Sequence, residues 1–275
     1  MIRYCFITNS PGLAAFVTAR GVDRVMVDLE LIGKVERQGH LSTVISRHSF
    51  DDVERVRAAI PGADLLVRLN SIHPGTEEEV ERAIELGADS LMLPMFRTAE
   101  EVRRFCLAVD GRSRVVLLLE TAQAVRNLDE ILDVSGIDEV HIGLNDLHLD
   151  LGLTFMFEPV ANGMVDDIAA AIRKRALPFG IGGLARAGEG LLPAELLVAE
   201  HVRLGSTGAI LSRTFHRNSP TVEELEQEMD FAAELGKLHA AHRKYSGAST
   251  AELQAIHNDV AARVASIVRS KTAHA

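Results

Sequence analysis

The sequence predicts an α/β protein, a TIM (β/α)8 barrel in which each of eight parallel strands is followed by a helical or loop segment. Short apolar runs recur along the chain, and segments with helical periodicity separate them. The runs are continuously apolar rather than alternating, as expected for parallel strands covered on both faces. Eight such units in about 250 residues is the usual size of this barrel.

A doubly wound open sheet is the rival architecture for a chain with this alternation. Such a sheet normally carries a glycine-rich turn of the form G-x-G-x-x-G directly after its first strand. The first apolar run of this chain is followed instead by SPGLAAF. We therefore expect the closed barrel.

The strands and several helix boundaries can be predicted individually. Three helices are expected to start at a capping pair, and single helices are expected over 125–134 and 191–204. The three capping pairs are Ser49 with Asp52, Thr76 with Glu79, and Thr98 with Glu101. The strands are expected at 3–9, 25–27, 65–67, 91–95, 115–119, 140–144, 179–181 and 209–211.

Helical periodicity continues beyond the last strand, over 222–245 and 251–271. One helix is enough to close the barrel, so the second is surplus, and its apolar stripe must be buried somewhere. The stripe consists of Leu253, Ile256, Val260, Val264, Ile267 and Val268. Both a neighbouring subunit and the bottom of the chain's own barrel remain open as its partner. We divide the chain into a barrel, 1–245, and a C-terminal helical extension of the same domain, 246–275.

The composition excludes several classes of protein. The chain has 275 residues and a net charge of -10, which argues against nucleic acid or an anionic membrane as partner. No apolar run approaches the roughly 20 residues of a membrane span, and the N-terminus lacks signal-peptide features, so we expect a cytoplasmic protein. Cys5 and Cys106 are expected to be core thiols rather than a disulfide. His141 is expected in the core and His201 on the surface.

Polar residues gather where the predicted strands end, which in a barrel is the active-site face. They could simply mark the points where strands reach water, but that explains an arginine and two carboxylates on close strands less well. The strand-end residues are Asp28 and Glu30, Arg68 and Asn70, Pro94, Glu120, Asn145 and Asp146, Gly182 and Gly183, and Arg213. From these strand ends we predict substrate-binding roles for Asp28, Glu30, Asn70, Pro94, Gly143 and Asn145.

Glu120 and Asp146 each follow an apolar strand, and one helix-length segment lies between them. A strand–helix–strand unit favours parallel strands, so both carboxylates should emerge at the same edge. Hard oxygen ligands without Cys or His suit Mg²⁺ or Mn²⁺. A 2-keto acid could occupy open positions on that metal while Arg68 holds the developing oxyanion. The alternative for Arg68 is a buried salt bridge to Glu120.

Six segments in unbroken order resemble the HpcH/HpaI aldolase and citrate lyase beta-subunit family. They are VDLE (27–30), LLVRLN (65–70), GADSLMLPMFRTAEEV (87–102), LLLETAQAV (117–125), GIDEVHIGLNDLHLDLG (136–152) and GIGGLARAGEG (180–190). The resemblance implies a TIM barrel, a divalent metal and pyruvate-like enolate chemistry, with Glu120 and Asp146 as metal ligands and Arg68 at the substrate oxyanion. It also implies a helix-swapped homo-oligomer, which we expect to be a trimer or a hexamer.

The sequence departs from the aldolase branch of that family at the acid/base residues. Leu31 stands where those aldolases have a histidine, Leu118 stands where they often have glutamine, and GLNDLH replaces GPADLS. Four loop histidines could substitute, although the chain has 11 histidines and such residues are mostly solvated. They are His40, His48, His73 and His148. We favour His48 because a helix N-terminus keeps a neighbouring histidine neutral.

The first functional hypothesis is therefore a metal-dependent carbon–carbon lyase that acts on a 2-keto acid, with an aldehyde as the other partner. A CoA-ester lyase of the citramalyl or malyl type is the second, and Lys34, Arg37 and Arg47 are the only candidates for its phosphates. The third is a barrel that binds metal and keto acid without catalysis, since Leu31 replaces the expected base.

Overall fold

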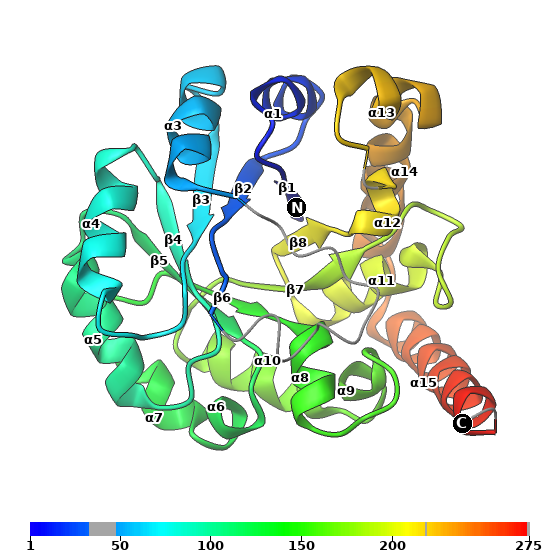
Figure 1. Cartoon of the computed structure of the whole chain (residues 1–275). Helices are drawn as coiled ribbons and strands as arrows, with labels where there is room; N and C mark the ends of the chain where they lie inside the picture. The colour runs from blue at the N-terminus through cyan, green and yellow to red at the C-terminus, as the bar shows by residue number, and fades with distance from the viewer. Residues whose placement is uncertain (33–47, 218, 274–275) are drawn as a thin grey trace.

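The computed structural model describes residues 1–32, 48–217 and 219–273. Within them, eight parallel strands close into a barrel in chain order, with β8 paired to β1 (Figure 1). The predicted TIM barrel is confirmed. The strands are β1 (Arg3–Ile7), β2 (Arg24–Asp28), β3 (Asp64–Arg68), β4 (Ser90–Leu93), β5 (Arg114–Leu119), β6 (Glu139–Ile142), β7 (Phe179–Leu184) and β8 (Gly208–Leu211).

Helices surround the barrel and cover the outer face of its strands (Figure 1). Those that follow the first five strands are α1 (Pro11–Thr18), α3 (Phe50–Ala59), α4 (Thr76–Glu85), α5 (Ala99–Val109), α6 (Ala122–Arg126) and α7 (Leu128–Leu132). The later ones are α8 (Leu144–Asp150), α9 (Glu158–Ala161), α10 (Met164–Lys174), α11 (Ala194–Leu204), α12 (Arg213–His216), α13 (Val222–Glu228), α14 (Phe231–Ser246) and α15 (Thr250–Thr272).

The barrel interior is layered, because every second residue of a strand faces the same side. On β2, Arg24 lies in the bottom layer, Met26 in the middle and Asp28 at the top. The middle layer is apolar and consists mainly of Cys5, Met26, Leu66, Met92, Val116 and Leu118. The pairing of β2 with β3 sets Asp28 beside Arg68 at the top. The strands thus present their polar last residues at one end of a filled barrel.

A buried ion network closes the opposite end. Arg24 donates from Nη1 and Nη2 to the two carboxylate oxygens of Glu139, at 3.0 and 3.1 Å, and from Nε to Asp64 at 2.8 Å. Burial alone would raise the pKa of Glu139, but Arg24 and Arg3 outweigh it, so that pKa is lowered. The bottom of the barrel is therefore occupied by structural charges, and the top is left for a site.

Two of the three predicted capping boxes are confirmed, those of Ser49 with Asp52 and Thr98 with Glu101. The third is wrong: α4 begins after Gly75, which has no side-chain cap, and Thr76 is already helical. Glu79 does not cap this helix because it makes a tertiary contact instead: its Oε1 accepts a hydrogen bond from Asn70 Nδ2 at 2.7 Å.

Some predicted boundaries are also wrong. The helix expected over 125–134 is two short helices that meet at Asn127, and the segment 222–245 breaks at Met229, whose φ of -167° is extended. The helix expected from residue 191 begins after Pro193. Leu144, expected to end a strand, is the first residue of α8. His201, expected on the surface, is 3% exposed, with its Nδ1 2.8 Å from Ser206 Oγ.

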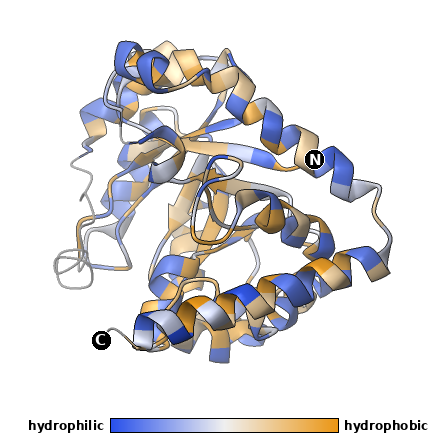
Figure 2. Ribbon diagram, turned by 90° about the vertical axis from the view of Figure 1, so that its right-hand side faces the viewer, coloured by the Kyte–Doolittle hydropathy of each residue, from blue (hydrophilic) through white to orange (hydrophobic). Residues whose placement is uncertain are grey.

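The C-terminal helix α15 packs on its own chain, against α9 and α11 (Figures 1 and 2). Val260 and Val264 are fully buried there, while the rest of the predicted apolar stripe is partly buried. His257 Nδ1 lies 3.2 Å from the buried carboxylate of Glu200 on α11. The stripe is thus covered by side helices rather than by the bottom of the barrel. In the described part of the chain, no helix is both long and apolar enough to cross a membrane.

Candidate active site

The top of the barrel brings together residues that are far apart in the sequence. β2 supplies Asp28 and, just beyond its end, Glu30, while β3 supplies Arg68. Glu120 follows β5 directly, and Asp146 lies in the first turn of α8, just after β6. The predicted ligands and the predicted arginine therefore share one end of the barrel.

Asp28 holds Arg68 through a bidentate ion pair. Its Nε and Nη2 donate to the two carboxylate oxygens of Asp28 at 2.8 and 2.7 Å, and its Nη1 lies 3.4 Å from Glu30 Oε2. Burial would lower the pKa of Arg68, but Asp28 and Glu30 raise it well above its usual value. Arg68 therefore pairs with Asp28 and Glu30 and not, as in the alternative prediction, with Glu120. A guanidinium has five N–H donors, so this fork leaves others for a ligand.

The Glu120 carboxylate is buried, at 2% exposure, and is positioned by the loop that follows β4. Its Oε1 accepts a hydrogen bond from the backbone N–H of Met95 at 3.2 Å. Met95 has a φ of +56°, an unusual left-handed conformation for a residue other than glycine. The next residue after Glu120, Thr121, donates from Oγ1 to the carbonyl of Phe96 at 2.8 Å. Two contacts therefore join this loop to the end of β5.

Gly143 lets α8 start close to Glu120. A Cβ atom at this position would lie 2.9 Å from both Cβ and Oε2 of Glu120, closer than side-chain atoms approach. The other end of α8 is tied to the same region, because Asp150 Oδ2 accepts a hydrogen bond from Ala122 N at 2.7 Å. Since β5 and β6 are neighbours, these contacts set Asp146 on the strand end next to that of Glu120.

The donor set suits a hard divalent cation. Both carboxylates offer oxygen atoms, and Mg²⁺ is usually held by one or two carboxylates while keeping several waters. No cluster of three or more His, Cys, Asp or Glu that could hold a metal occurs in residues 1–32, 48–217 and 219–273. A two-carboxylate site would leave coordination positions for a substrate, so the residues present fit the predicted Mg²⁺ or Mn²⁺.

His48 lies beside Asp28, directly before the N-cap of α3. Its Nδ1 accepts a hydrogen bond from the backbone N–H of Asp28 at 3.0 Å. In a neutral imidazole only one nitrogen carries a proton, so this contact assigns the proton to Nε2. The proton of a neutral His48 is therefore on Nε2, whereas a general base needs a free acceptor nitrogen.

Asn70 uses its side chain to position the segment after β2. Its Oδ1 accepts hydrogen bonds from Leu31 N at 2.8 Å and Ile32 N at 2.9 Å. Leu31, which the resemblance aligns with a histidine, is 51% exposed. Pro94 is buried directly after β4, and Asn145 is half-buried in the first turn of α8. In this geometry Asn70 orders the mouth of the barrel through its neighbours.

Of the other predicted histidines, the two that the structure describes make contacts within their own loop or helix. His73 Nδ1 accepts from Gly75 N at 3.1 Å, and its Nε2 is 3.3 Å from Glu79, so it closes its own loop. His148 Nδ1 lies against backbone carbonyls of its own helix, which leaves Nε2 as an acceptor. His40 lies outside the described residues, as do Lys34, Arg37 and Arg47, the candidates for a CoA site.

Arg213 is a residue of the site that the sequence marked only as a strand end. It is half-buried in α12, directly after β8. Burial lowers its pKa, Asp28 opposes this and Arg68 adds to it, so Arg213 lies within electrostatic reach of both. The only signal in the sequence was its place after the last strand.

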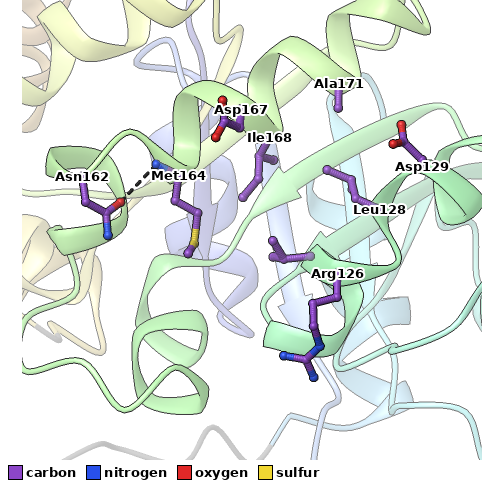
Figure 3. A pocket seen from close by; sticks show the side chains of 9 residues that line it. Arg126, Leu128, Asp129, Asn162, Met164, Asp167, Ile168 and Ala171 are labelled. Carbon is purple, nitrogen blue, oxygen red and sulfur yellow. Dashed lines mark hydrogen bonds between the residues drawn. The ribbon is translucent and has the colours of Figure 1, made fainter.

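A hollow of about 570 Å³ lies elsewhere, on the outer face between α6–α7 and α10 (Figure 3). It contains none of the predicted site residues. Its lining is Val125, Arg126, Leu128, Asp129, Asn162, Met164, Asp167, Ile168 and Ala171.

Comparison with known sequences gives one family and several relatives. The model of the HpcH/HpaI aldolase/citrate lyase family matches residues 4–173. A hydroxypyruvate/pyruvate aldolase of Rhizorhabdus wittichii is 26% identical over 224 residues, 67% of this chain and 86% of that protein. A 4-hydroxy-2-oxo-heptane-1,7-dioate aldolase of Salmonella paratyphi B is 26% identical over 159 residues. That match spans 46% of this chain and only 57% of the relative's length.

Solved structures share the fold at low sequence identity. The crystal structure of an HpcH/HpaI aldolase from Desulfitobacterium hafniense has a TM-score of 0.62 at 18% identity, covering 90% of this chain and 94% of that one. The citrate synthase SbnG has a TM-score of 0.59 at 16% identity, covering 87% and 93%.

Proposed function

The chain belongs to the HpcH/HpaI aldolase/citrate lyase family, and from this premise we propose that it is a divalent-metal-dependent carbon–carbon lyase. It cleaves or forms the bond beside a pyruvate-like enolate of a 2-keto acid, with an aldehyde as the second partner. The observation that carries the proposal is the pair Glu120 and Asp146 on adjacent strand ends, at the same mouth as the Asp28-oriented guanidinium of Arg68. The named activity of the R. wittichii relative is consistent with it.

In this proposal Glu120 and Asp146 hold Mg²⁺ or Mn²⁺ through their carboxylate oxygens. A divalent cation bound there supplies Lewis-acid polarisation of the keto group. Gly143 and Met95 keep the Glu120 carboxylate in place, the first by lacking a side chain and the second by its N–H. The substrate-binding roles predicted for Glu30, Asn70, Pro94 and Asn145 also belong to the proposal.

Arg68 stabilises the negative charge that develops on the keto oxygen. Asp28 fixes two of its donors, so the guanidinium keeps one orientation and does not have to be ordered during the reaction. Removing one such donor in other enzymes lowers the rate by about 10²–10³-fold.

His48 donates a hydrogen bond from Nε2 to the substrate or to a water molecule without giving up its proton. The backbone N–H of Asp28 occupies Nδ1, so the ring cannot pass a proton between its two nitrogens. A neutral imidazole can stabilise an oxyanion in this way. We expect His48→Gln, which keeps a donor, to retain more activity than His48→Ala in steady-state kinetics; equal loss in both variants would contradict this role.

The proposal includes a homo-oligomer, a trimer or a hexamer, and a reducing cytoplasmic location that suits the free thiols of Cys5 and Cys106. Size-exclusion chromatography with light scattering measures the first, and a monomer at micromolar concentration would contradict it.

The test is turnover of pyruvate with a panel of aldehydes, followed by NMR with Mg²⁺ or Mn²⁺ and with EDTA. We expect a metal-dependent aldol product from the wild type and none from Asp146→Ala. Asp129→Ala, which removes a carboxylate on the far outer face, is the matched control and should behave like the wild type. Cleavage of a citramalyl- or malyl-CoA ester alone would replace the proposal by the CoA-ester alternative. No turnover of either class with metal bound would favour the non-catalytic barrel.

A further inference from the structure

We propose that Asp150 is a positioning residue for the proposed metal centre. Through its hydrogen bond to Ala122 it fixes the orientation of α8, and thereby the side chain of Asp146 on the same helix. The inference rests on the proposed function and deepens it, because it adds a residue that sets the affinity for the metal without being a ligand. Asp150 is the last residue of α8 and lies outside the pattern of strand ends in the sequence.

The helix α8 is short, so few contacts determine how it is oriented. It has seven residues, and Leu144 and Leu147 are its buried ones. These apolar contacts hold the helix against the barrel but are non-directional. Asp146 and Asp150 are four residues apart and therefore lie on one face of α8, one turn from each other. A directional contact at Asp150 thus also fixes the direction of Asp146.

Two hydrogen bonds join α8 to the segment that contains Glu120, one at each end of the helix. At its start, the N–H of Gly143 donates to the carbonyl of Leu119 at 2.9 Å. At its end, Asp150 Oδ2 accepts from the N–H of Ala122 at 2.7 Å. Leu119 and Ala122 flank Glu120 in the sequence, and Asp146 lies between the two anchored ends of α8. The two proposed ligands are therefore held relative to each other by contacts on both sides.

The Ala122 N–H is a well-fixed donor. It belongs to the first turn of α6, where an N–H has no acceptor within its own helix. The preceding residue, Thr121, is fully buried, and its Oγ1 donates to the carbonyl of Phe96 at 2.8 Å and accepts from Ala124 N at 3.1 Å. Asp150 therefore ties α8 to a rigid point next to Glu120 rather than to a movable loop.

Contacts of this kind control how well carboxylates bind a metal. Residues that orient the ligands, without touching the metal, typically change its affinity by about 10–100-fold when they are removed. Loss of the Asp150 contact would leave α8 with its anchor at Gly143 and its two leucines, so that Asp146 would have to be ordered when the metal binds. The role involves no bond formation or cleavage at Asp150.

Electron paramagnetic resonance of free Mn²⁺ tests the inference in the full-length protein. We expect Asp150→Ala to bind Mn²⁺ about tenfold more weakly than the wild type. Asp150→Asn should stay within about threefold of the wild type, because its amide oxygen can accept the same hydrogen bond from Ala122. Asp230→Ala is the matched control: it also removes an exposed carboxylate that accepts a backbone N–H at a helix start, that of Ala233, but on α14. This control should bind Mn²⁺ like the wild type.

Deuterium exchange into the pyruvate methyl group separates positioning from a general loss of structure. At saturating Mn²⁺ the bound ion itself holds Asp146 in place, so the exchange rate of Asp150→Ala should come within about threefold of the wild type. The defect should appear only as a higher Mn²⁺ concentration required for half-maximal exchange. A rate that stays low at saturating Mn²⁺ would contradict the positioning role.

Three results of the binding experiment would also overturn the inference. They are unchanged Mn²⁺ affinity in Asp150→Ala, an equal loss in Asp150→Ala and Asp150→Asn, which would indicate that the charge or direct ligation matters, and an equal loss in Asp230→Ala. The wild type separates this from the proposed function. Mn²⁺ binding and exchange by the wild type, with no effect of Asp150→Ala, would reject only the role of Asp150, whereas a wild type that neither binds Mn²⁺ nor exchanges would reject both.

Discussion

Gly143 is the residue on which the geometry of the proposed metal site depends most closely. The space for its missing side chain is occupied by Glu120, the buried carboxylate at the end of the neighbouring strand. The sequence placed Gly143 among the substrate-binding residues because it lies near the end of a predicted strand. Its contact with Glu120 indicates a role in setting the ligand in place.

Gly143→Ala is therefore expected to lower the affinity for Mn²⁺ by more than about tenfold, because the new methyl group would displace the Glu120 carboxylate. Electron paramagnetic resonance of free Mn²⁺ measures this directly. Gly62→Ala is the control, since no atom lies within 4 Å of its added Cβ. Unchanged Mn²⁺ affinity in Gly143→Ala would show that Glu120 is not a ligand in this position.

At the scale of single residues, the positions of the proposed ligands could be predicted from the sequence, but the acid/base chemistry could not. Glu120, Asp146 and Arg68 could be predicted because each directly follows or ends an apolar strand. The tautomer of His48 could not, because it depends on the backbone N–H of Asp28, twenty residues earlier in the chain. Arg213 was visible as a strand end, but its electrostatic interaction with Asp28 and Arg68 is a property of the folded barrel.

At the scale of elements, the C-terminal helix α15 packs on α9 and α11 through one apolar stripe. Its two fully buried residues are Val260 and Val264, and His257 adds one polar contact to Glu200. Hydrophobic and hydrophilic residues alternate along this helix (Figure 2). The docking of α15 on α9 and α11 should therefore be sensitive to a single charge.

Val264→Asp is expected to destabilise this docking by about 3 kcal/mol or more, because it buries an unpaired carboxylate. Hydrogen exchange followed by mass spectrometry should then show loss of protection in α15 and in its contacts on α9 and α11. Ala265→Asp, on the exposed side of the same turn, should leave the exchange unchanged. Equal protection in both variants would mean that Val264 is not buried as described.

Element boundaries were predictable where local signals decide them and not where tertiary contacts do. The capping boxes at Ser49 and Thr98 are local, and both formed. The break at Asn127 coincides with a hydrogen bond from its side chain to the carbonyl of Arg97, 2.9 Å away in another loop. Glu79 failed as a capping residue for a similar reason, since it bonds Asn70. Such partners cannot be read from helical periodicity.

At the scale of the whole molecule, three buried histidines make the stability depend on pH. Burial lowers the pKa of His141 to about 4, of His201 to about 3 and of His216 to about 4. In the unfolded chain each would titrate near 6.5 and therefore bind a proton that the folded chain excludes. The stability contributed by the neutral rings is complete above pH 6.5 and is lost progressively as the pH falls below it.

We therefore expect the free energy of unfolding to fall between pH 6 and pH 4, by up to about 1.4 kcal/mol per pH unit for each histidine. Glu139 adds to the pH dependence near pH 4. Because its pKa is lowered in the folded chain, it contributes stability above its usual pKa of 4.5, and this contribution is lost as the pH falls further. Urea titrations at a series of pH values measure the slope. In His216→Phe, the slope of the free energy of unfolding against pH should fall by the equivalent of about one bound proton. An unchanged slope would contradict a neutral His216.

The central claim is that Glu120 and Asp146 hold a divalent metal beside Arg68 and that the site forms a pyruvate enolate. Deuterium exchange into the pyruvate methyl group tests this most directly, because it needs no knowledge of the aldehyde. We expect the wild type in D₂O with Mg²⁺ or Mn²⁺ to exchange the methyl protons, and Asp146→Ala, Glu120→Gln and Arg68→Ala to lose at least about 10²-fold in rate. Exchange that persists in EDTA, or in Asp146→Ala at the wild-type rate, would contradict the account.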